Sequence, residues 1–172
     1  MSGALIVTAE LAPAEFAFFD GLRKAHFPPE RNRIGAHLTM FHALPPTVVD
    51  EAKAALKTLS AGPPPSAMVA GLMNLGGGVA YRIVSNDLES IRADLAQQFH
   101  GLLTAQDGQG WRPHITVQNK VTSRVARAVM ACLEQNFAPR PLAIAGLGLH
   151  RYMGGPWETI ARYPFRGSGR RT

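Results

Sequence analysis

The order of apolar and polar positions predicts strands and helices along most of the chain. Residues 4–10 form a short apolar run with β-branched members, as expected for a buried strand. A helix is predicted from Pro13, because proline is tolerated in a first helical turn and apolar residues then recur at helical spacing. Its inner face would carry Phe16, Phe19, Leu22 and His26. Paired prolines end this helix, and Gly35 marks a turn into a strand over residues 36–42.

The middle of the chain predicts a helix, a hairpin and a second helix. Residues 47–61 have the apolar face typical of a helix. Residues 66–75 and 79–85 predict two strands joined by three glycines. Asn86 and Glu89 then resemble a capping arrangement at a helix start. The apolar face of that helix comprises Leu88, Ile91, Leu95, Phe99 and Leu102.

The last third predicts a strand, a helix and two closing strands. The strand is HITVQN (114–119), and Thr122 can cap the helix that follows. Its inner face would carry Val125, Val129, Cys132 and Leu133. Residues 142–153 and 157–165 are the closing strands, the second with one face formed by Trp157, Thr159, Ala161, Tyr163 and Phe165. Because strands arrive in adjacent pairs, we expect an α+β fold with antiparallel sheets.

Composition and charge narrow the class of protein. With 46% hydrophobic and 17% charged residues in a chain of 172, we expect one folded domain over residues 1–165. The net charge of +6 suits an anionic partner such as a nucleotide or RNA. Three of the arginines lie in residues 166–172, which we predict to be a disordered basic tail, so the body carries only +3.

A single cysteine, Cys132, excludes an intramolecular disulfide and argues against a cysteine-based zinc site. We expect it to pack in the core. The chain has no signal-peptide pattern and no apolar run long enough to span a membrane, so a cytoplasmic location without membrane association is expected.

Two short segments carry the same polar pattern. AHLTMFH (36–42) and PHITVQN (113–119) both contain histidine, an aliphatic residue, threonine and an apolar residue in that order. Side chains alternate between the faces of a strand, so each histidine shares a face with its threonine. If the two strands lie side by side, two imidazoles and two hydroxyls face one cleft.

This combination suits acid-base chemistry on a phosphate. An imidazole has a pKa near 6.5, so near neutral pH one histidine can be an uncharged base and the other a protonated acid, without a metal. The threonine hydroxyls can donate hydrogen bonds to phosphate oxygens.

The two motifs, HLTM and HITV, resemble those of the two-histidine phosphoesterase superfamily, which includes bacterial 2′-5′ RNA ligase-like proteins and cyclic nucleotide phosphodiesterases. FPPERN (27–32), WRPHITVQNK (111–120) and GGPWE (154–158) are similar to a bacterial branch of 2′-5′ RNA ligase-like proteins. The resemblance implies a bilobal, pseudo-twofold α+β fold, with two antiparallel sheets, flanking helices and a central cleft.

The resemblance also implies roles for the motif residues. His37 and His114 would be the catalytic pair, and Thr39 and Thr116 would hold the phosphate. The implied activity is hydrolysis of a 2′,3′-cyclic phosphate or a 2′-5′ linkage, in RNA ends or small cyclic nucleotides, by a monomer with no metal or other cofactor. One histidine would activate water and the other would protonate the departing ribose oxygen. Pseudo-symmetry leaves the acid and the base unassigned, and the substrate stays open.

Further residues are candidates for substrate binding. Arg112 directly precedes the second motif, and Arg151, Tyr152 and Trp157 flank the turn MGGP. Guanidinium and aromatic groups can contact a phosphate or stack on a base. Tyr81 is a similar candidate.

The remaining histidines near these motifs receive no catalytic role. His42 lies one residue past the series that shares a face with His37, so it should point the other way unless the strand bulges. His26 and His150 have no metal-like spacing.

Two other classes of protein stay open. One is a non-catalytic RNA- or nucleotide-binding module. The other is a metal-dependent phosphohydrolase, which the scarcity of clustered Asp and His disfavours.

Overall fold

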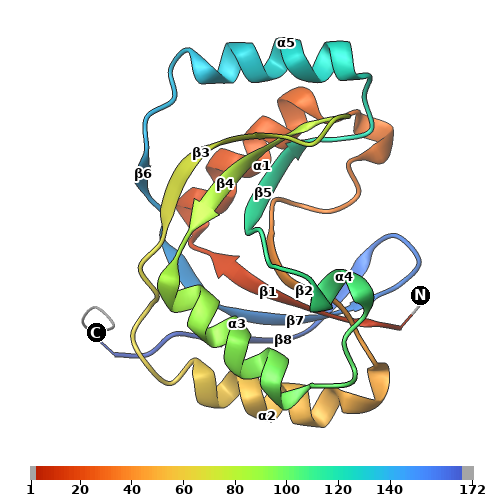
Figure 1. Cartoon of the computed structure of the whole chain (residues 1–172), viewed down its shortest axis with the longest axis vertical. Helices are drawn as coiled ribbons and strands as arrows, with labels where there is room; N and C mark the ends of the chain where they lie inside the picture. Colours follow the sequence, from red (N-terminus) through yellow and green to blue (C-terminus); the bar gives the residue numbers. More distant parts are fainter. Residues whose placement is uncertain (1–2, 168–172) are drawn as a thin grey trace.

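The computed structural model describes residues 3–167 and arranges them in two antiparallel sheets with helices packed against them (Figure 1). In chain order the elements are β1 (Leu5–Leu11), α1 (Pro13–His26), the 3₁₀ turn η1 (Pro29–Arg31), β2 (Leu38–Leu44), the 3₁₀ turn η2 (Pro46–Val48), α2 (Val49–Leu59), β3 (Met68–Asn74), β4 (Val79–Val84), α3 (Asn86–Gln98), α4 (Ala105–Gly108), β5 (His114–Gln118), α5 (Ser123–Glu134), β6 (Arg140–Pro141), β7 (Ile144–Tyr152) and β8 (Trp157–Pro164).

The described strands form a first sheet of order β2-β1-β7-β8 and a second sheet of order β5-β4-β3-β6. Every paired neighbour is antiparallel. The two motif strands, β2 and β5, are each an edge strand of their own sheet, and they lie against one another. The predicted α+β fold of two antiparallel sheets with flanking helices is confirmed.

The helices pack against the two sheets, and α1 contacts both of them. Helix α2 packs against β7 and β8 of the first sheet, and α5 packs against β3 and β4 of the second (Figure 1). Helix α1 connects β1 to β2 in the first sheet but packs against β5 of the second. Helix α3 connects β4 to β5 yet reaches β2, where the Arg92 guanidinium donates a hydrogen bond to the Met40 carbonyl. The two motif strands are thereby held together.

The apolar positions of both motifs belong to the core, as predicted. Leu38, Met40, Ile115 and Val117 are all 0% exposed. Burial of each such side chain stabilises the fold by about 1.5–3 kcal/mol. That burial orients the alternate, polar positions of each strand toward the opposite face.

The ends of two predicted helices are wrong. Helix α3 is capped by Ser85 rather than Asn86, because the Ser85 hydroxyl accepts the hydrogen bond of the Leu88 N–H. The helix ends at Gln98, so Leu102 lies beyond it and is exposed. The helix predicted over residues 47–61 begins as the turn η2 and becomes α-helical only at Val49.

Helix α5 begins as predicted, with the Thr122 hydroxyl accepting from the Val125 N–H. Its inner face is narrower than predicted: Ala126 is buried, whereas Val125 and Cys132 are exposed. The prediction of Cys132 as a core residue is therefore wrong. The helix lies along one side of β3 and β4, so only a narrow stripe of its surface is covered.

β-Bulges on β2 and β8 change which side chains share a face. On β2 the pairing shifts so that Thr39 lies opposite Thr8 while Phe41 lies opposite Val7, and Phe41 is fully buried. On β8 the pairing shifts after Thr159, so the predicted strict alternation from Trp157 to Phe165 does not hold. A bulge inserts one unpaired residue and reverses the alternation beyond it.

The end of the described chain is tied to the body. The Arg166 N–H donates to the carbonyls of Ser60 and Gly62. The rest of the predicted basic tail, residues 168–172, lies outside the described residues.

Among the helices of the described part, none combines the length and apolar character needed to cross a membrane.

Candidate active site

The two motif histidines lie at corresponding places in the two sheets. His37 directly precedes β2, and His114 is the first residue of β5. Hydrogen bonds hold these strands together: the Trp111 indole N–H donates to the Thr39 carbonyl at 3.1 Å, and the Arg23 guanidinium on α1 donates to the Thr116 carbonyl at 3.0 Å. The two motif strands therefore lie side by side, which is the condition that the sequence analysis set for one shared cleft.

Both imidazoles are held by the same backbone contact. Nδ1 of His37 lies 2.8 Å from the Gly35 carbonyl, and Nδ1 of His114 lies 2.7 Å from the Arg112 carbonyl. A carbonyl oxygen only accepts, so each Nδ1 carries a proton. Each Nε2 is therefore the atom that can take up or release a proton at a ligand.

The surroundings of His37 favour its uncharged form. Burial lowers its pKa to about 4, although the hydrogen bond to Gly35 acts in the opposite direction. The positive charges of Arg23, His114 and His150 lower the pKa further. At neutral pH His37 is an uncharged imidazole whose Nε2 can accept a proton.

The two motif threonines keep their hydroxyls available. Their carbonyls are used to join the strands, as described above, and both side chains are partly exposed. Within residues 3–167 neither the Thr39 nor the Thr116 hydroxyl has a hydrogen-bond partner. Each can donate to an oxyanion without breaking an existing contact.

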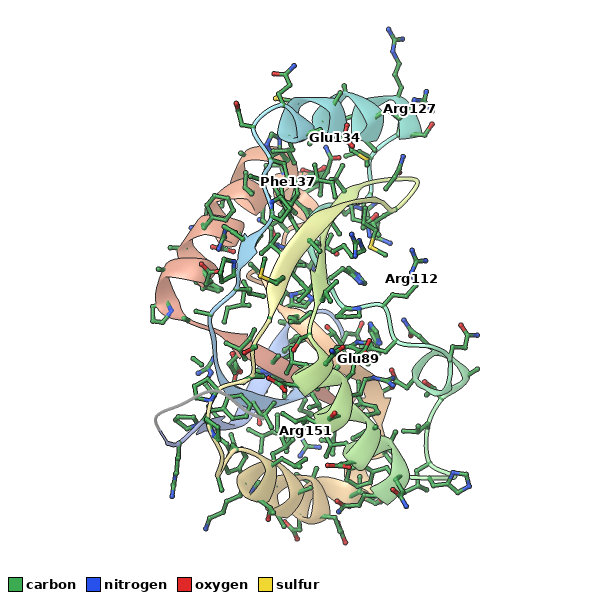
Figure 2. All side chains as sticks on the ribbon, turned by 60° about the vertical axis from the view of Figure 1, so that its left-hand side comes forward. Glu89, Arg112, Arg127, Glu134, Phe137 and Arg151 are labelled. Carbon is green, nitrogen blue, oxygen red and sulfur yellow. The ribbon has the colours of Figure 1, made fainter. Side chains whose placement is uncertain are left out.

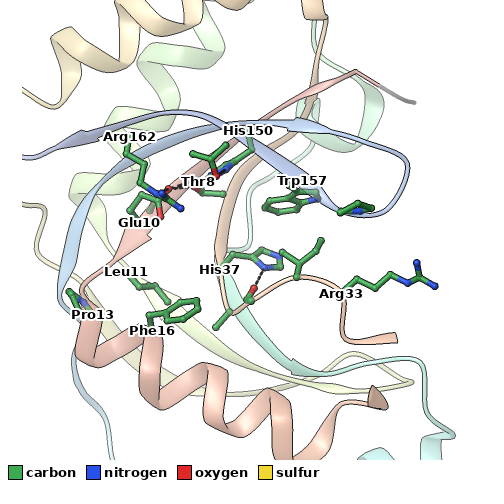
Figure 3. A pocket seen from close by; sticks show the side chains of 16 residues that line it. Thr8, Glu10, Leu11, Pro13, Phe16, Arg33, His37, His150, Trp157 and Arg162 are labelled. Carbon is green, nitrogen blue, oxygen red and sulfur yellow. Dashed lines mark hydrogen bonds and ion pairs between the residues drawn. The ribbon is translucent and has the colours of Figure 1, made fainter. Parts of the chain in front are cut away.

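A cavity of about 510 Å³ opens beside His37 (Figure 3). This volume is within the usual range of small-molecule sites. Residues from β1, α1, the segment before β2, β7 and β8 line it, including Thr8, Glu10, Phe16, Arg33, His37, His150, Trp157, Thr159 and Arg162.

One wall of the cavity is a polar cluster built around His150. Nε2 of His150 lies 2.9 Å from the Thr8 hydroxyl and 3.3 Å from Glu10 Oε1, and its Nδ1 lies 3.1 Å from the Thr159 hydroxyl. Nε of Arg162 lies 3.5 Å from the same Glu10 oxygen. We call Thr8, Glu10, His150, Thr159 and Arg162 the His150 cluster. His150 is only 6% exposed.

Sequence reasoning missed the His150 cluster. Its members come from β1, β7 and β8, and they converge over Gly148, where a Cβ would clash with Glu10 and lie 2.7 Å from the Thr8 hydroxyl. The bulge on β8 brings Arg162 to the same cavity as Thr159. The only local signal is the pair of polar residues, Thr8 and Glu10, on one face of an otherwise apolar strand.

Of the four residues predicted to bind substrate besides the motif threonines, only Trp157 lines the cavity. Trp157 lines the cavity, with ring centroids 4.7 Å from His37 and 5.5 Å from His150. Arg112 is exposed and projects from the segment before β5 (Figure 2). Arg151 donates to the Gly3 carbonyl at 3.4 Å, and neither it nor Tyr152 lines the cavity.

Tyr81, the similar candidate, is buried away from the cavity. Its ring contacts Phe19 and Phe137, with centroid separations of 5.3 and 6.0 Å. Tyr81 is 5% exposed and is part of the hydrophobic core.

His42 is part of a separate polar contact. Its Nδ1 lies 3.1 Å from Oδ1 of Asp107, which is 1% exposed. The same carboxylate accepts the backbone N–H groups of His42 and Ala43. The strand does bulge before His42, and the contact joins β2 to the short helix α4, which the sequence did not predict.

Over residues 3–167, no group of three or more His, Cys, Asp or Glu side chains is arranged to hold a metal ion. The polar groups that the arrangement brings together are the imidazoles, hydroxyls, guanidinium groups and the Glu10 carboxylate described above.

Comparison with known proteins identifies the family. The sequence profile of the 2′-5′ RNA ligase superfamily matches residues 10–156. The match covers most of the chain and includes both motifs, so the chain belongs to this superfamily. No curated protein sequence matches it.

Solved structures share the fold. TT0787 of Thermus thermophilus is 15% identical with a TM-score of 0.67, covering 96% of this chain and 100% of its own. E. coli LigT complexed with 3′-AMP is 16% identical with a TM-score of 0.59, covering 97% of this chain and 100% of its own. A structure described as a phosphoesterase is 17% identical with a TM-score of 0.63 and covers 97% and 100%. At these identities the likeness concerns the fold.

Proposed function

We propose that this protein is a metal-independent phosphodiesterase that hydrolyses 2′,3′-cyclic phosphates or 2′-5′ phosphodiester linkages of RNA or nucleotides. The observation that carries the proposal is the matched pair of imidazoles, each with Nδ1 bound to a backbone carbonyl and Nε2 left for proton transfer. Membership of the 2′-5′ RNA ligase superfamily supports it, as do structures of E. coli LigT with 3′-AMP and with phosphate.

In the proposed reaction His37 is the general base and His114 the general acid. Uncharged Nε2 of His37 takes a proton from water, whose oxygen attacks phosphorus. The bond from phosphorus to the ribose 3′ oxygen breaks, and protonated His114 gives its Nε2 proton to that oxygen, leaving a 2′-phosphate. Thr39 and Thr116 donate hydrogen bonds to the phosphate oxygens.

The assignment of His37 as the base rests on its surroundings. The burial and neighbouring positive charges that lower its pKa to about 4 keep it unprotonated near neutral pH. A base must be unprotonated when water approaches.

One chain holds both motifs, so we propose that a monomer is active. We also propose a cytoplasmic location, which would give the protein access to RNA ends.

The test uses 2′,3′-cyclic nucleotides and 2′-5′ oligonucleotides in the presence of EDTA. His37→Ala and His114→Ala should each lose at least ~10²-fold in kcat, the low end of the contribution of a general acid or base. His100→Ala is the matched control, because His100 is exposed in the turn after α3, and it should turn over like wild type. Near-normal turnover by either motif variant would contradict the proposal.

The same experiment separates the alternatives. Binding of the nucleotides by wild type without hydrolysis would identify a non-catalytic RNA- or nucleotide-binding module that uses the same cleft. Loss of wild-type activity in EDTA, with recovery on adding a divalent metal, would identify a metal-dependent phosphohydrolase.

A further inference from the structure

The cavity beside His37 has features that phosphate chemistry does not use. Glu10 contributes a carboxylate to its lining, and Phe16 contributes an aromatic ring that is 43% exposed. A carboxylate repels a phosphate, so this part of the cavity suits another portion of a substrate. An exposed aromatic ring in a cavity lining is a surface that a flat ligand can cover.

The apolar walls suit a planar ring. Phe16 comes from α1 and Trp157 from β8, so the two aromatic side chains enter the cavity from different elements (Figure 3). Leu11 and Pro13 extend the wall beside Phe16. The Phe16 ring lies close to Gly35, where an added Cβ would be 2.9 Å from it. Every nucleobase has a π-face that stacks on such a ring.

The polar end of the cavity offers hydrogen-bond acceptors. The contacts of Glu10 with Thr8, His150 and Arg162 are all made by Oε1, and Oε2 has no hydrogen-bond partner in the part of the chain that the structure describes. Burial raises the pKa of Glu10, but the hydrogen bond and charge of His150 and the charge of Arg162 outweigh it, so the net pKa is lowered. The carboxylate is therefore ionised and only accepts.

A donor lies beside this acceptor. The side chain of Arg162 is 63% exposed, and its Nε lies 3.5 Å from Oε1 of Glu10. Its other guanidinium N–H groups can donate to a ligand held at Oε2. The cavity thus presents an acceptor and a donor next to one another.

We propose that this cavity binds the base of the substrate and selects guanine, with Glu10 accepting from the ring N1–H and the amino group and Arg162 donating to O6. The inference rests on the proposed function. Guanine has two adjacent N–H donors and a neighbouring acceptor. Adenine and cytosine have an acceptor next to their single amino group, and uracil has one N–H between two acceptors. Each of these bases therefore offers the carboxylate fewer adjacent N–H donors than guanine does.

The test compares kcat/KM for the four nucleoside 2′,3′-cyclic phosphates. Wild type should prefer the guanosine substrate by about 10-fold or more, the range expected for a bidentate base contact. In Glu10→Gln, kcat/KM should fall for the guanosine substrate and stay the same for the other three, so that most of the preference is lost. The reason is that an amide has one accepting oxygen where the carboxylate has two. Equal kcat/KM for all four substrates in wild type would overturn the inference and leave the phosphodiesterase activity established.

A matched pair of phenylalanines tests the stacking surface. Phe16→Leu should raise KM for every substrate. Phe18→Leu should not, because Phe18 is also exposed on α1, at 49%, but lines a different pocket with Arg140. An unchanged KM in Phe16→Leu would contradict a base at this wall.

Direct binding keeps the inference testable if no substrate is hydrolysed. Absence of hydrolysis would contradict the proposed function. Calorimetry with guanosine 2′-monophosphate and cytidine 2′-monophosphate would then test whether the cavity still binds guanine in preference to cytosine. Tighter binding of the guanosine nucleotide by wild type, lost in Glu10→Gln, supports the inference, whereas equal binding of the two overturns it. If Glu10→Gln does not fold, Arg162→Met tests the contact to O6 in the same assays.

Discussion

At the scale of the residue, His37 and His114 are equivalent in the sequence and different in the structure. Each follows its backbone partner by two residues and precedes a motif threonine. In the structure, burial and nearby positive charges bring the pKa of His37 to about 4. The local motif could be recognised from the sequence, but the burial of one copy comes from the other strands and helices around it.

This difference predicts a pH dependence of stability. The folded-state pKa of His37, about 4, lies below its ordinary value of 6.5, so the unfolded chain binds this proton first as pH falls. Above pH 6.5 the effect is absent, and between pH 6.5 and 4 it should remove at most about 3 kcal/mol from the free energy of unfolding. When the pH falls from 6.5 to 4, the free energy of unfolding should decrease less in His37→Gln than in wild type. Urea denaturation at the two pH values measures both decreases.

His100→Gln controls for removal of one histidine, because that imidazole is exposed. Its loss of stability between the same two pH values should follow wild type. If His37→Gln also followed wild type, His37 would not be the buried uncharged group that the proposed mechanism requires.

At the scale of the element, the segment before β5 is attached to β2 by three side chains. Asp107 binds the backbone of β2, Trp111 donates to Thr39, and Arg92 donates to both Met40 and the Asp107 carbonyl. Helix α4 places Asp107 at this position, and its four residues were too short to be predicted from periodicity. The attachment determines where β5, and with it His114, lies along β2.

Asp107→Asn should therefore destabilise the protein and reduce turnover. An amide replaces one accepting oxygen with a donor, which leaves a buried N–H of β2 facing another donor, at a cost of about 3 kcal/mol. Chemical denaturation measures the loss, and kcat should fall under conditions where the variant is still folded.

His42→Ala is the matched control for Asp107→Asn. The His42 side chain is 42% exposed, so losing its hydrogen bond should cost only about 1 kcal/mol. Equal losses in the two variants would show that the side-chain contact, and not the backbone contact, holds α4 to β2.

At the scale of the whole molecule, α1 couples the two sheets. Arg23 on this helix is 4% exposed, donates to Asn32 in the segment before β2 and to Thr116 on β5, and lies 4.4 Å from the centre of the Phe27 ring. Its charge is one of those that lower the pKa of His37. A residue that no motif contains thus joins the two halves of the proposed site.

Arg23→Met should raise the pKa of His37, because it removes a positive charge that disfavours protonation. An NMR titration of the histidine ring protons measures this shift. Arg23→Lys keeps the charge and should keep the low pKa, and Lys24→Met, at a side chain that is 76% exposed, should leave it unchanged. A pKa of His37 that stays the same in Arg23→Met would contradict the coupling.

The sequence by itself determined the elements and the motif pair. Spacing of apolar residues predicted β1, α1, the β3–β4 hairpin and the helices α3 and α5, since local periodicity reflects which side of each element is buried. The repeated pattern predicted His37, Thr39, His114 and Thr116 as one site, because strand geometry places alternate residues on one face.

Only the tertiary structure decided what surrounds that site. The His150 cluster draws on three strands and needs a bulge on β8 and the absence of a side chain at Gly148, none of which follows from local pattern. The low pKa of His37 and the cavity beside it likewise arise from groups far apart in the chain. Local periodicity reports which face of an element is buried, whereas pairing register and bulges decide which buried groups meet.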